Sequence, residues 1–364
     1  MKTSFKLAAL AAALGMAMTA QAADITLYGS VSTGLVVKHT AAAGTKGEEG
    51  YVAKQTSYGM ESGWYGDSNW GITGGEELGN GWKVGFTLES NFNSDDGSMG
   101  EAGRIFDSQS YLTIGNDFVT LAAGRVGALS SGGGDFDLLG GFDPLEAKFG
   151  IGGMGVFVTR DLVANNTLAA LVTPVQGLTL AGAISSGVED DAGRWVDNVH
   201  YHALAAHYEV DALAASLIYE RVRLPEAQDV DVYSFGLSYD FGVIKPMLAY
   251  QYGKHVTDLA NETLEGLFAG ERGKTQSMLL GVTAPVFGGN LMVSVQHFGA
   301  KYEESGEKLA ANVFGIGYDY PLSKRTSLYT GATYAKGGKG LKKGKEGSAE
   351  FNSYAFGVGL KHTF

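Results

Sequence analysis

The chain has 364 residues, a formal net charge of −12 and no cysteine. Without cysteine, an exported form cannot be stabilised by disulfides. The acidic balance argues against a nucleic-acid partner, which would require a basic face.

The N-terminal residues are typical of an export signal. Lys2 and Lys6 flank the start of an apolar stretch over residues 7–18, and residues 20–22 match the small-x-small pattern that signal peptidase reads. The stretch is shorter than the roughly 20 apolar residues of a membrane-spanning helix. We therefore expect cleavage after Ala22, with a signal peptide over residues 1–22 and one mature domain over residues 23–364.

From Asp24 to the last residue, apolar and polar side chains alternate with a period of two. The first segment places Ile25, Leu27 and Val31 on one face, and the last places Tyr354 and Phe356 on one face. Alternation of this kind is typical of strands with one apolar and one polar face. No convincing amphipathic helix interrupts the series, so the fold class is predicted to be all-β.

Sixteen alternating segments can be counted, separated by short turns and long polar loops in alternation. They begin near residues 24, 57, 82, 104, 118, 160, 178, 197, 212, 230, 243, 274, 290, 310, 325 and 351. Short turns at one end and long loops at the other are typical of an antiparallel transmembrane barrel. A count that differs by two stays open, because residues 197–208 are weakly patterned.

A soluble β-sandwich or jelly roll would also alternate, because its apolar face is buried in a core. Tyrosines recur near the predicted strand ends, for example Tyr28, Tyr219, Tyr239 and Tyr334. Aromatic girdles at two membrane interfaces would explain this placement. The pattern therefore favours a 16-stranded antiparallel transmembrane β-barrel.

Several stretches resemble the Gram-negative porin family, particularly its beta-proteobacterial branch. The mature start, residues 24–29 (DITLYG), is similar to the family's first strand. Residues 68–81 (SNWGITGGEELGNG) resemble the second strand and first periplasmic turn, and residues 120–125 (TLAAGR) the strand that leads into the constriction loop. The final strand ends in the aromatic Phe364, which such porins present as an assembly signal to the barrel-assembly machinery.

The resemblance implies an outer-membrane homotrimer in contact with lipid and lipopolysaccharide, with a water-filled channel in each barrel for passive diffusion of ions and small hydrophilic solutes. It also implies that the third extracellular loop, about residues 126–154, folds inward and narrows the pore. On the resemblance, the acids of this loop face bases on the barrel wall. The expected constriction residues are Asp135, Asp137, Asp143 and Glu146 against Arg125, Lys83 and Arg160.

The sequence departs from the family pattern at Ser108. Related porins often carry an arginine at this place in the fourth strand. The loss of that base would weaken the positive wall, so strong anion selectivity is not expected, and the ion preference stays open.

Signals for catalysis or cofactors are weak, and we expect neither an enzyme nor a cofactor or metal site. Residues 150–155 match G-x-G-x-x-G, but no helix pattern follows, and 55 glycines make chance matches common. His200 and His202 share a strand face without a nearby carboxylate of the same parity. Two other classes stay open: a non-conducting barrel that acts as a surface adhesin or ligand through its loops, and an outer-membrane hydrolase.

Overall fold

The computed structural model describes residues 24–48, 50–189, 193–225, 227–257, 263–264, 266–268, 270–345 and 347–364. The expected signal peptide, residues 1–22, lies outside the described residues. No helix in the described ranges is both long and apolar enough to cross a membrane.

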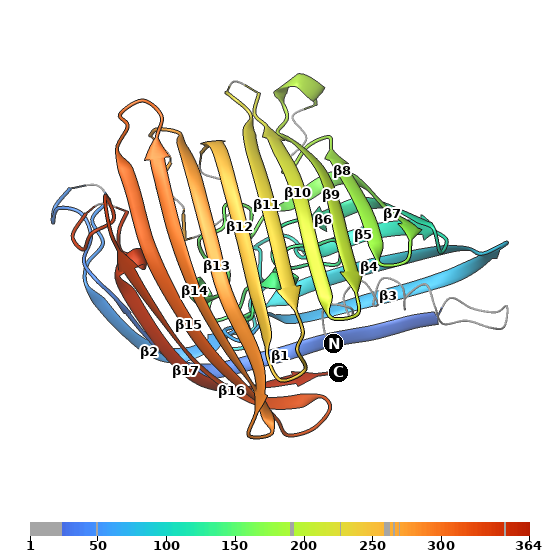
Figure 1. Ribbon diagram of the computed structural model, residues 1–364, viewed down its shortest axis with the longest axis horizontal. Coiled ribbons are helices and arrows are strands. Elements are labelled where there is room, and N and C mark those ends of the chain that lie inside the picture. Colours follow the sequence, from blue (N-terminus) through green and yellow to red (C-terminus); the bar gives the residue numbers. More distant parts are fainter. Residues whose placement is uncertain are drawn as a thin grey trace.

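Strands account for nearly all of the regular structure (Figure 1). Their bounds are β1 Asp24–Thr40, β2 Gln55–Ser62, β3 Ser68–Gly79, β4 Trp82–Phe92, β5 Gln109–Gly115, β6 Val119–Gly127, β7 Val163–Val175, β8 Leu178–Ser185, β9 His200–Val210, β10 Leu213–Arg223, β11 Val230–Tyr239, β12 Lys245–Val256, β13 Gly273–Val286, β14 Gly289–Tyr302, β15 Lys308–Pro321, β16 Thr326–Gly337 and β17 Ser353–Thr363. In the described part of the chain, four short 3-10 turns accompany them: η1 Gly140–Phe142, η2 Gly150–Gly152, η3 Trp195–Asp197 and η4 Glu350–Asn352.

The sheet closes on itself, because β1 pairs with β17 on one edge and with β2 and β3 on the other. β2 lies against Thr33–Thr40 of β1 and β3 lies against Asp24–Ser30, so β2 and β3 together occupy one strand position. All pairings are antiparallel, which confirms the predicted 16-stranded antiparallel barrel. Each expected strand start agrees with the structure to within five residues, the largest difference being residue 104 against Gln109.

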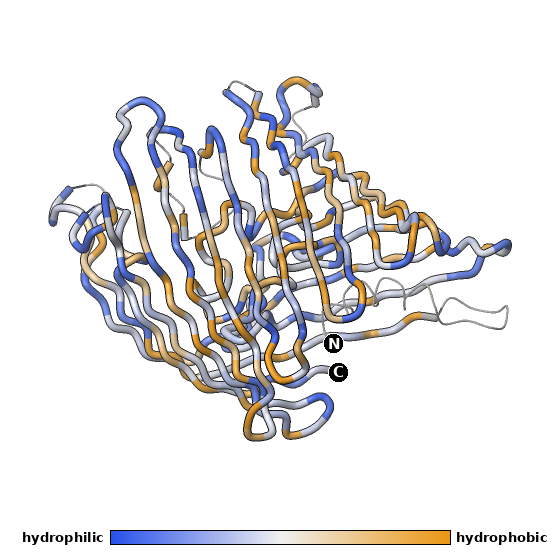
Figure 2. Tube along the Cα trace, viewed as in Figure 1, coloured by the Kyte–Doolittle hydropathy of each residue, from blue (hydrophilic) through white to orange (hydrophobic). Residues whose placement is uncertain are grey.

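The two faces of the strands differ in character, as the period-two pattern predicts. In β10, Leu217 is 63% exposed, whereas its neighbours Ser216 and Ile218 are buried. In β17, Phe356 is 55% exposed and Ala355 is buried. Hydrophobic residues recur along the strands of the wall, and hydrophilic ones concentrate in the long loops (Figure 2). The exposed apolar side chains therefore form the outer face of the barrel, the face that contacts lipid in a transmembrane barrel.

The connections also follow the predicted asymmetry. Tight turns join β3 to β4 and β7 to β8, whereas the connections from β1 to β2 and from β16 to β17 are long. In the β3–β4 turn, Asn80 and Gly81 have φ angles of 52° and 77°, the combination that a two-residue hairpin turn with right-handed strand twist requires.

The connection between β6 and β7, residues 128–162, is packed against the inner face of the wall; we call it the inner loop. The Ser216 hydroxyl of β10 donates to the Leu138 carbonyl at 2.7 Å, and the Val158 N–H donates to Gln251 Oε1 of β12 at 2.6 Å. In β14, Gln296 Nε2 donates to the Gly152 carbonyl at 2.6 Å. These wall side chains have the parity opposite to the exposed apolar residues, so the inner loop lies inside the barrel.

Apolar contacts reinforce this placement. Leu139, Phe142 and Phe157 of the inner loop are almost completely buried and belong to a cluster that includes inward residues of the strands, such as Ile218 of β10. The tip residue Phe149 lies on glycines of the wall, because a Cβ at Gly331 would come within 2.5 Å of its ring. The missing side chain at Gly331 thus leaves room for the loop to lie flat on the wall.

Candidate functional site

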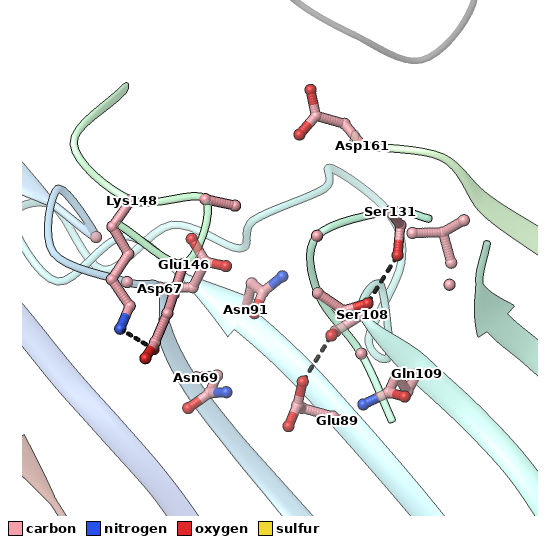
Figure 3. A pocket seen from close by; sticks show the side chains of 18 of the residues that line it. Asp67, Asn69, Glu89, Asn91, Ser108, Gln109, Ser131, Glu146, Lys148 and Asp161 are labelled. Carbon is pink, nitrogen blue, oxygen red and sulfur yellow. Dashed lines mark hydrogen bonds and ion pairs between the residues drawn. The ribbon is translucent and has the colours of Figure 1, made fainter. Parts of the chain in front are cut away.

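A cavity of about 520 Å³ lies between the inner loop and the opposite wall (Figure 3). It is bordered by side chains of β1, β3, β4 and β17, by the β4–β5 connection and by the inner loop. The charged groups on its lining are Asp67, Glu89, Asp107, Asp135, Glu146, Asp161, Lys148, Arg160 and Lys361.

Carboxylates and hydroxyls form one part of the lining. Glu89 projects from β4 with inward parity and accepts hydrogen bonds from the Ser108 hydroxyl at 2.6 Å and the Tyr28 hydroxyl at 3.0 Å. On the inner loop, Asp135 accepts a hydrogen bond from the Tyr111 hydroxyl of β5, and its N–H donates to Gln109 Oε1 at 2.9 Å. Ser108 therefore lies on the cavity wall, in direct contact with an acid.

Two lysines, Lys148 and Lys361, form another part of the lining and lie over the ring of Tyr65. Lys148 Nζ is 2.7 Å from Glu146 Oε2 and lies 4.7 Å from the centre of the Tyr65 ring. Lys361 Nζ, from β17, lies 5.7 Å from the same ring centre. Figure 3 places Lys148 and Glu146 beside Asp67, across the cavity from Glu89 and Ser108. Positive and negative side chains thus face one another across the cavity.

Residues 63–67 interrupt the strand between β2 and β3, and Tyr65 of this segment packs against Phe149 of the inner loop. The Phe149 N–H donates to the Trp64 carbonyl at 2.8 Å, and the Trp64 ring meets the Phe149 ring edge-on with centres 5.0 Å apart. The interruption therefore connects the wall to the tip of the inner loop.

Of the residues expected at the constriction, Asp135, Glu146 and Arg160 border the cavity. Arg160 donates from Nη2 to the Ala147 carbonyl at 2.8 Å, and its Nε is 3.8 Å from Asp161 Oδ1. The structure thus brings three of the seven residues together, two acids and one base.

Arg125 is placed beside the cavity. Its Nε donates to the Asp107 carbonyl at 2.8 Å, Nη1 donates to Asn165 Oδ1 at 2.6 Å, and Nη2 is 3.3 Å from Glu101 Oε2. The strand shifts register between Gly124 and Val126, and the cavity lining given by the described residues does not include Arg125. In this position the guanidinium links the β4–β5 connection to β7.

Lys83 has the expected inward parity but lies near the turn end of β4, where its Nζ is 2.9 Å from Glu77 Oε1. Glu89 is six residues further along the same strand, a separation of about 20 Å at 3.3 Å per residue. Lys83 is therefore well removed from the cavity along the barrel wall.

Asp137 and Asp143 hold turns of the inner loop. Asp137 Oδ1 accepts the Leu139 N–H at 2.9 Å, and Asp143 accepts the N–H groups of Leu145 and Ala147 at 3.0 and 2.8 Å. Burial raises the pKa of the Asp143 carboxyl to about 7. Neither side chain borders the cavity among the described residues.

The expected constriction residues do not include six charged residues of the lining: Asp67, Glu89, Asp107, Lys148, Asp161 and Lys361. Glu89 shares the parity of Lys83, so its inward direction was readable from β4. The inward direction of Lys361 could also be predicted, because Lys361 lies on the polar face of the last strand. The proximity of Glu89 and Lys361 to the inner loop could not be predicted, because β4 and β17 are separated by most of the chain.

A buried carboxylate attaches the inner loop to the wall at its start. Glu220 of β10 is fully buried; it accepts the Tyr201 hydroxyl at 2.6 Å, the Ser130 N–H at 3.2 Å and the Ser130 hydroxyl. The Tyr201 oxygen in turn accepts the Leu129 N–H at 2.9 Å. These bonds hold the loop at the point where it leaves β6.

Replacing Glu220 with alanine is expected to loosen this attachment. The exchange leaves buried donors of Ser130 and Tyr201 without their acceptor, at a cost of about 1–3 kcal/mol in the free energy of unfolding. Glu220→Gln keeps one acceptor oxygen and is the matched control. Heat-induced loss of the folded form on gels measures the effect; equal transition temperatures for the alanine variant and the parent would contradict the anchoring role.

Comparison with known proteins gives a consistent result. The family model described as Gram-negative porin matches residues 7–340. An outer membrane porin protein of Bordetella pertussis is 31% identical over 98% of this chain and 99% of its own length. Outer membrane porin protein 32 of Delftia acidovorans is 29% identical over the full length of both chains. The solved anion-selective porin from Comamonas acidovorans has a TM-score of 0.72 and 24% identity, and covers 94% of this chain and 100% of its own.

Proposed function

The chain belongs to the Gram-negative porin family, and from this premise we propose that the cavity between the inner loop and the wall is the narrowest part of its channel. The protein is an outer-membrane porin through which ions and small hydrophilic solutes diffuse passively. The proposal is that these solutes pass the charged groups around Glu89, Glu146 and Lys148.

The observation that carries this proposal is the charged lining of a cavity inside the barrel. The inner loop packs on one side of the lumen, and the space left open is bordered by carboxylates, ammonium groups and hydroxyls. Opposed charges across a narrow aqueous gap create a transverse field that orients water and favours polar over apolar solutes. Such a passage discriminates by size and charge without any catalytic group, bound metal or cofactor.

Each expected constriction residue then has a role. Asp135, Glu146 and Arg160 contribute charge at the narrow point, where they border the cavity. Arg125 positions the β4–β5 connection through the Asp107 carbonyl, and Lys83 belongs to the turn end of the channel.

Asp137 and Asp143 shape the inner loop through the N–H groups that they accept. Their proposed role is to keep Asp135 and Glu146, which flank them in sequence, on the cavity side of the loop.

The protein is also proposed to work as a homotrimer. The exposed apolar parity of the wall suits contact with neighbouring copies and with lipid, and the long loops suit contact with lipopolysaccharide. One of the solved structures that share this fold is the trimer form of OmpT, an outer membrane protein of Vibrio cholerae. The aromatic C-terminal strand is proposed to be recognised by the barrel-assembly machinery.

Reconstitution into a planar bilayer tests the channel function. A trimer with one pore per barrel is expected to give conductance steps in groups of three, since each copy opens its own aqueous path. A folded, heat-modifiable barrel that never conducts would contradict the proposal and favour a surface-binding role for the loops.

A further inference from the structure

The cavity lining carries more negative than positive groups. Its carboxylates are Asp67, Glu89, Asp107, Asp135, Glu146 and Asp161, and its bases are Lys148, Arg160 and Lys361. The excess has the sign of the whole chain, whose formal net charge is −12. Distant charges are screened within about 8 Å at physiological salt, so the groups on the lining itself decide which ion passes.

Each base on the lining lies beside a carboxylate. Lys148 Nζ is 2.7 Å from Glu146 Oε2, and Arg160 Nε is 3.8 Å from Asp161 Oδ1. Lys361 Nζ lies against Gly66, the residue before Asp67: a Cβ added at Gly66 would be 2.9 Å from it. The positive field of all three bases is therefore largely compensated locally.

Asp107 has a basic neighbour outside the lining. The Arg125 guanidinium donates to the Asp107 carbonyl oxygen, and Asp107 Oδ1 accepts the Asn91 N–H at 2.7 Å. The charge of Asp107 is thus partly offset from behind the wall.

Glu89 differs from the acids that lie beside a base, because its hydrogen bonds come from the neutral side chains of Ser108, Tyr28 and Gln109. Ser108 and Tyr28 donate to its two oxygens at 2.6 and 3.0 Å, and none of the ion pairs found in the described part of the chain includes Glu89. Neutral donors stabilise a carboxylate without cancelling its charge. Glu89 therefore places a carboxyl group on the cavity lining that no ion pair of the described residues offsets.

We propose that this channel passes cations in preference to anions, and that Glu89, held by Ser108, is the main determinant of the preference. The inference rests on the proposed function, because it requires the cavity to lie on the ion path. The permeant class would be small monovalent cations and cationic polar solutes. A base at position 108 would lie beside Glu89 and remove the preference.

The test is the reversal potential of the reconstituted protein under a potassium chloride gradient. The parent is expected to show a ratio of potassium to chloride permeability above one. Ser108→Arg is expected to lower the potassium permeability by about fivefold and to raise the chloride permeability by a similar factor, the effect of one unit charge acting on each ion at about 4 Å through water, so the ratio falls by more than about tenfold. Glu89→Gln, which keeps the shape and the hydrogen-bonding oxygen, is expected to lower it in the same direction.

Gln176→Arg is the matched control. It adds the same charge at an exposed position in the tight turn between β7 and β8, away from the cavity lining. The control should keep the parent's ratio. Circular dichroism and heat modifiability of each variant establish that the barrel is folded before its ratio is compared.

These outcomes distinguish a failure of the proposed cation preference from a failure of the proposed channel function. A conducting parent with a permeability ratio below one overturns the cation preference and leaves the channel function intact. If Ser108→Arg and Glu89→Gln have the same permeability ratio as Gln176→Arg, the proposed role of Glu89 is overturned. A folded parent that does not conduct overturns the proposed function, and the preference with it.

Discussion

Deleting residues 130–142 and joining the ends with a short Gly-Ser linker is expected to raise the single-channel conductance by on the order of twofold. Conductance through an aqueous pore is limited by its narrowest cross-section. The deleted segment carries Gly132, Gly133, Gly134 and Asp135, which form one border of the cavity. Its removal takes away one side of the narrow point while the barrel wall stays closed.

The closed wall is the reason to expect that the variant still folds. Every strand of the barrel keeps its two pairing partners, because the segment lies between β6 and β7 and contributes no strand. The deletion does remove buried apolar side chains such as Leu138 and Phe142, so some loss of stability is expected.

The matched control is deletion of residues 45–50 from the tip of the β1–β2 connection. This tip lies beyond the pairing of Ala43 with Val52 and is not part of the cavity lining among the described residues. Its removal should leave the conductance unchanged. Equal conductance for the parent and for the 130–142 deletion, with both proteins folded, would show that the inner loop does not limit ion flow.

Removal of Phe364 is expected to reduce the amount of folded protein in the outer membrane of expressing cells by about tenfold or more. The C-terminal residue contributes to the closure of the barrel, since Phe364 N–H donates to the Gly29 carbonyl at 3.0 Å and Gly29 N–H donates to the Phe364 carbonyl at 3.3 Å. The loss of these two bonds corresponds to about 2 kcal/mol if each contributes about 1 kcal/mol, which is more than a tenfold change in an equilibrium.

The aromatic ring has a local role as well. A Cβ added at Gly29 would lie 2.7 Å from the Phe364 ring, so the ring covers the β1 backbone at the point where the barrel closes. Truncation therefore removes both the last backbone pair of the closure and the aromatic group proposed as the assembly signal.

Two measurements distinguish these contributions. Folding of the purified variant into detergent micelles reports on closure alone, whereas its yield in cells also reports on recognition by the assembly machinery. Phe287→Ala, which removes an exposed aromatic from the β13–β14 turn, should behave like the parent in both assays. A parental yield of folded protein in cells after loss of Phe364 would refute the assembly role.

The strands of this protein could be predicted well because strand formation follows a local rule. Alternation in β10 and β17 shows directly which side chains face outward, since successive residues of a strand point to opposite faces. The sequence predicts one strand that begins near residue 57. In the structure β2 and β3 together occupy this strand position against β1. The interruption at residues 63–67 was not foreseen, because Trp64 and Tyr65 turn inward to meet Phe149 of the inner loop.

The expected constriction residues were predicted less well. Asp135, Glu146 and Arg160 border the cavity because the backbone path of the inner loop directs them toward it. Asp137 and Asp143 instead accept N–H groups of their own turns, a choice that depends on the backbone path of the loop. Arg125 lies at a register shift between β6 and β7. Such a shift cannot be recognised from the alternation of apolar and polar residues.

The sequence by itself determined the all-β class, the number of strand positions, and which face of each strand is apolar; the export signal over residues 1–22 stays a prediction. These properties depend on residues that are close together in the chain. Only the tertiary structure decided which charges meet. Glu89 of β4, Ser108 before β5, Glu146 of the inner loop and Lys361 of β17 border one cavity because barrel closure and strand register bring them together. Register is a relation between strands, so it is set by pairing energies that no single segment contains.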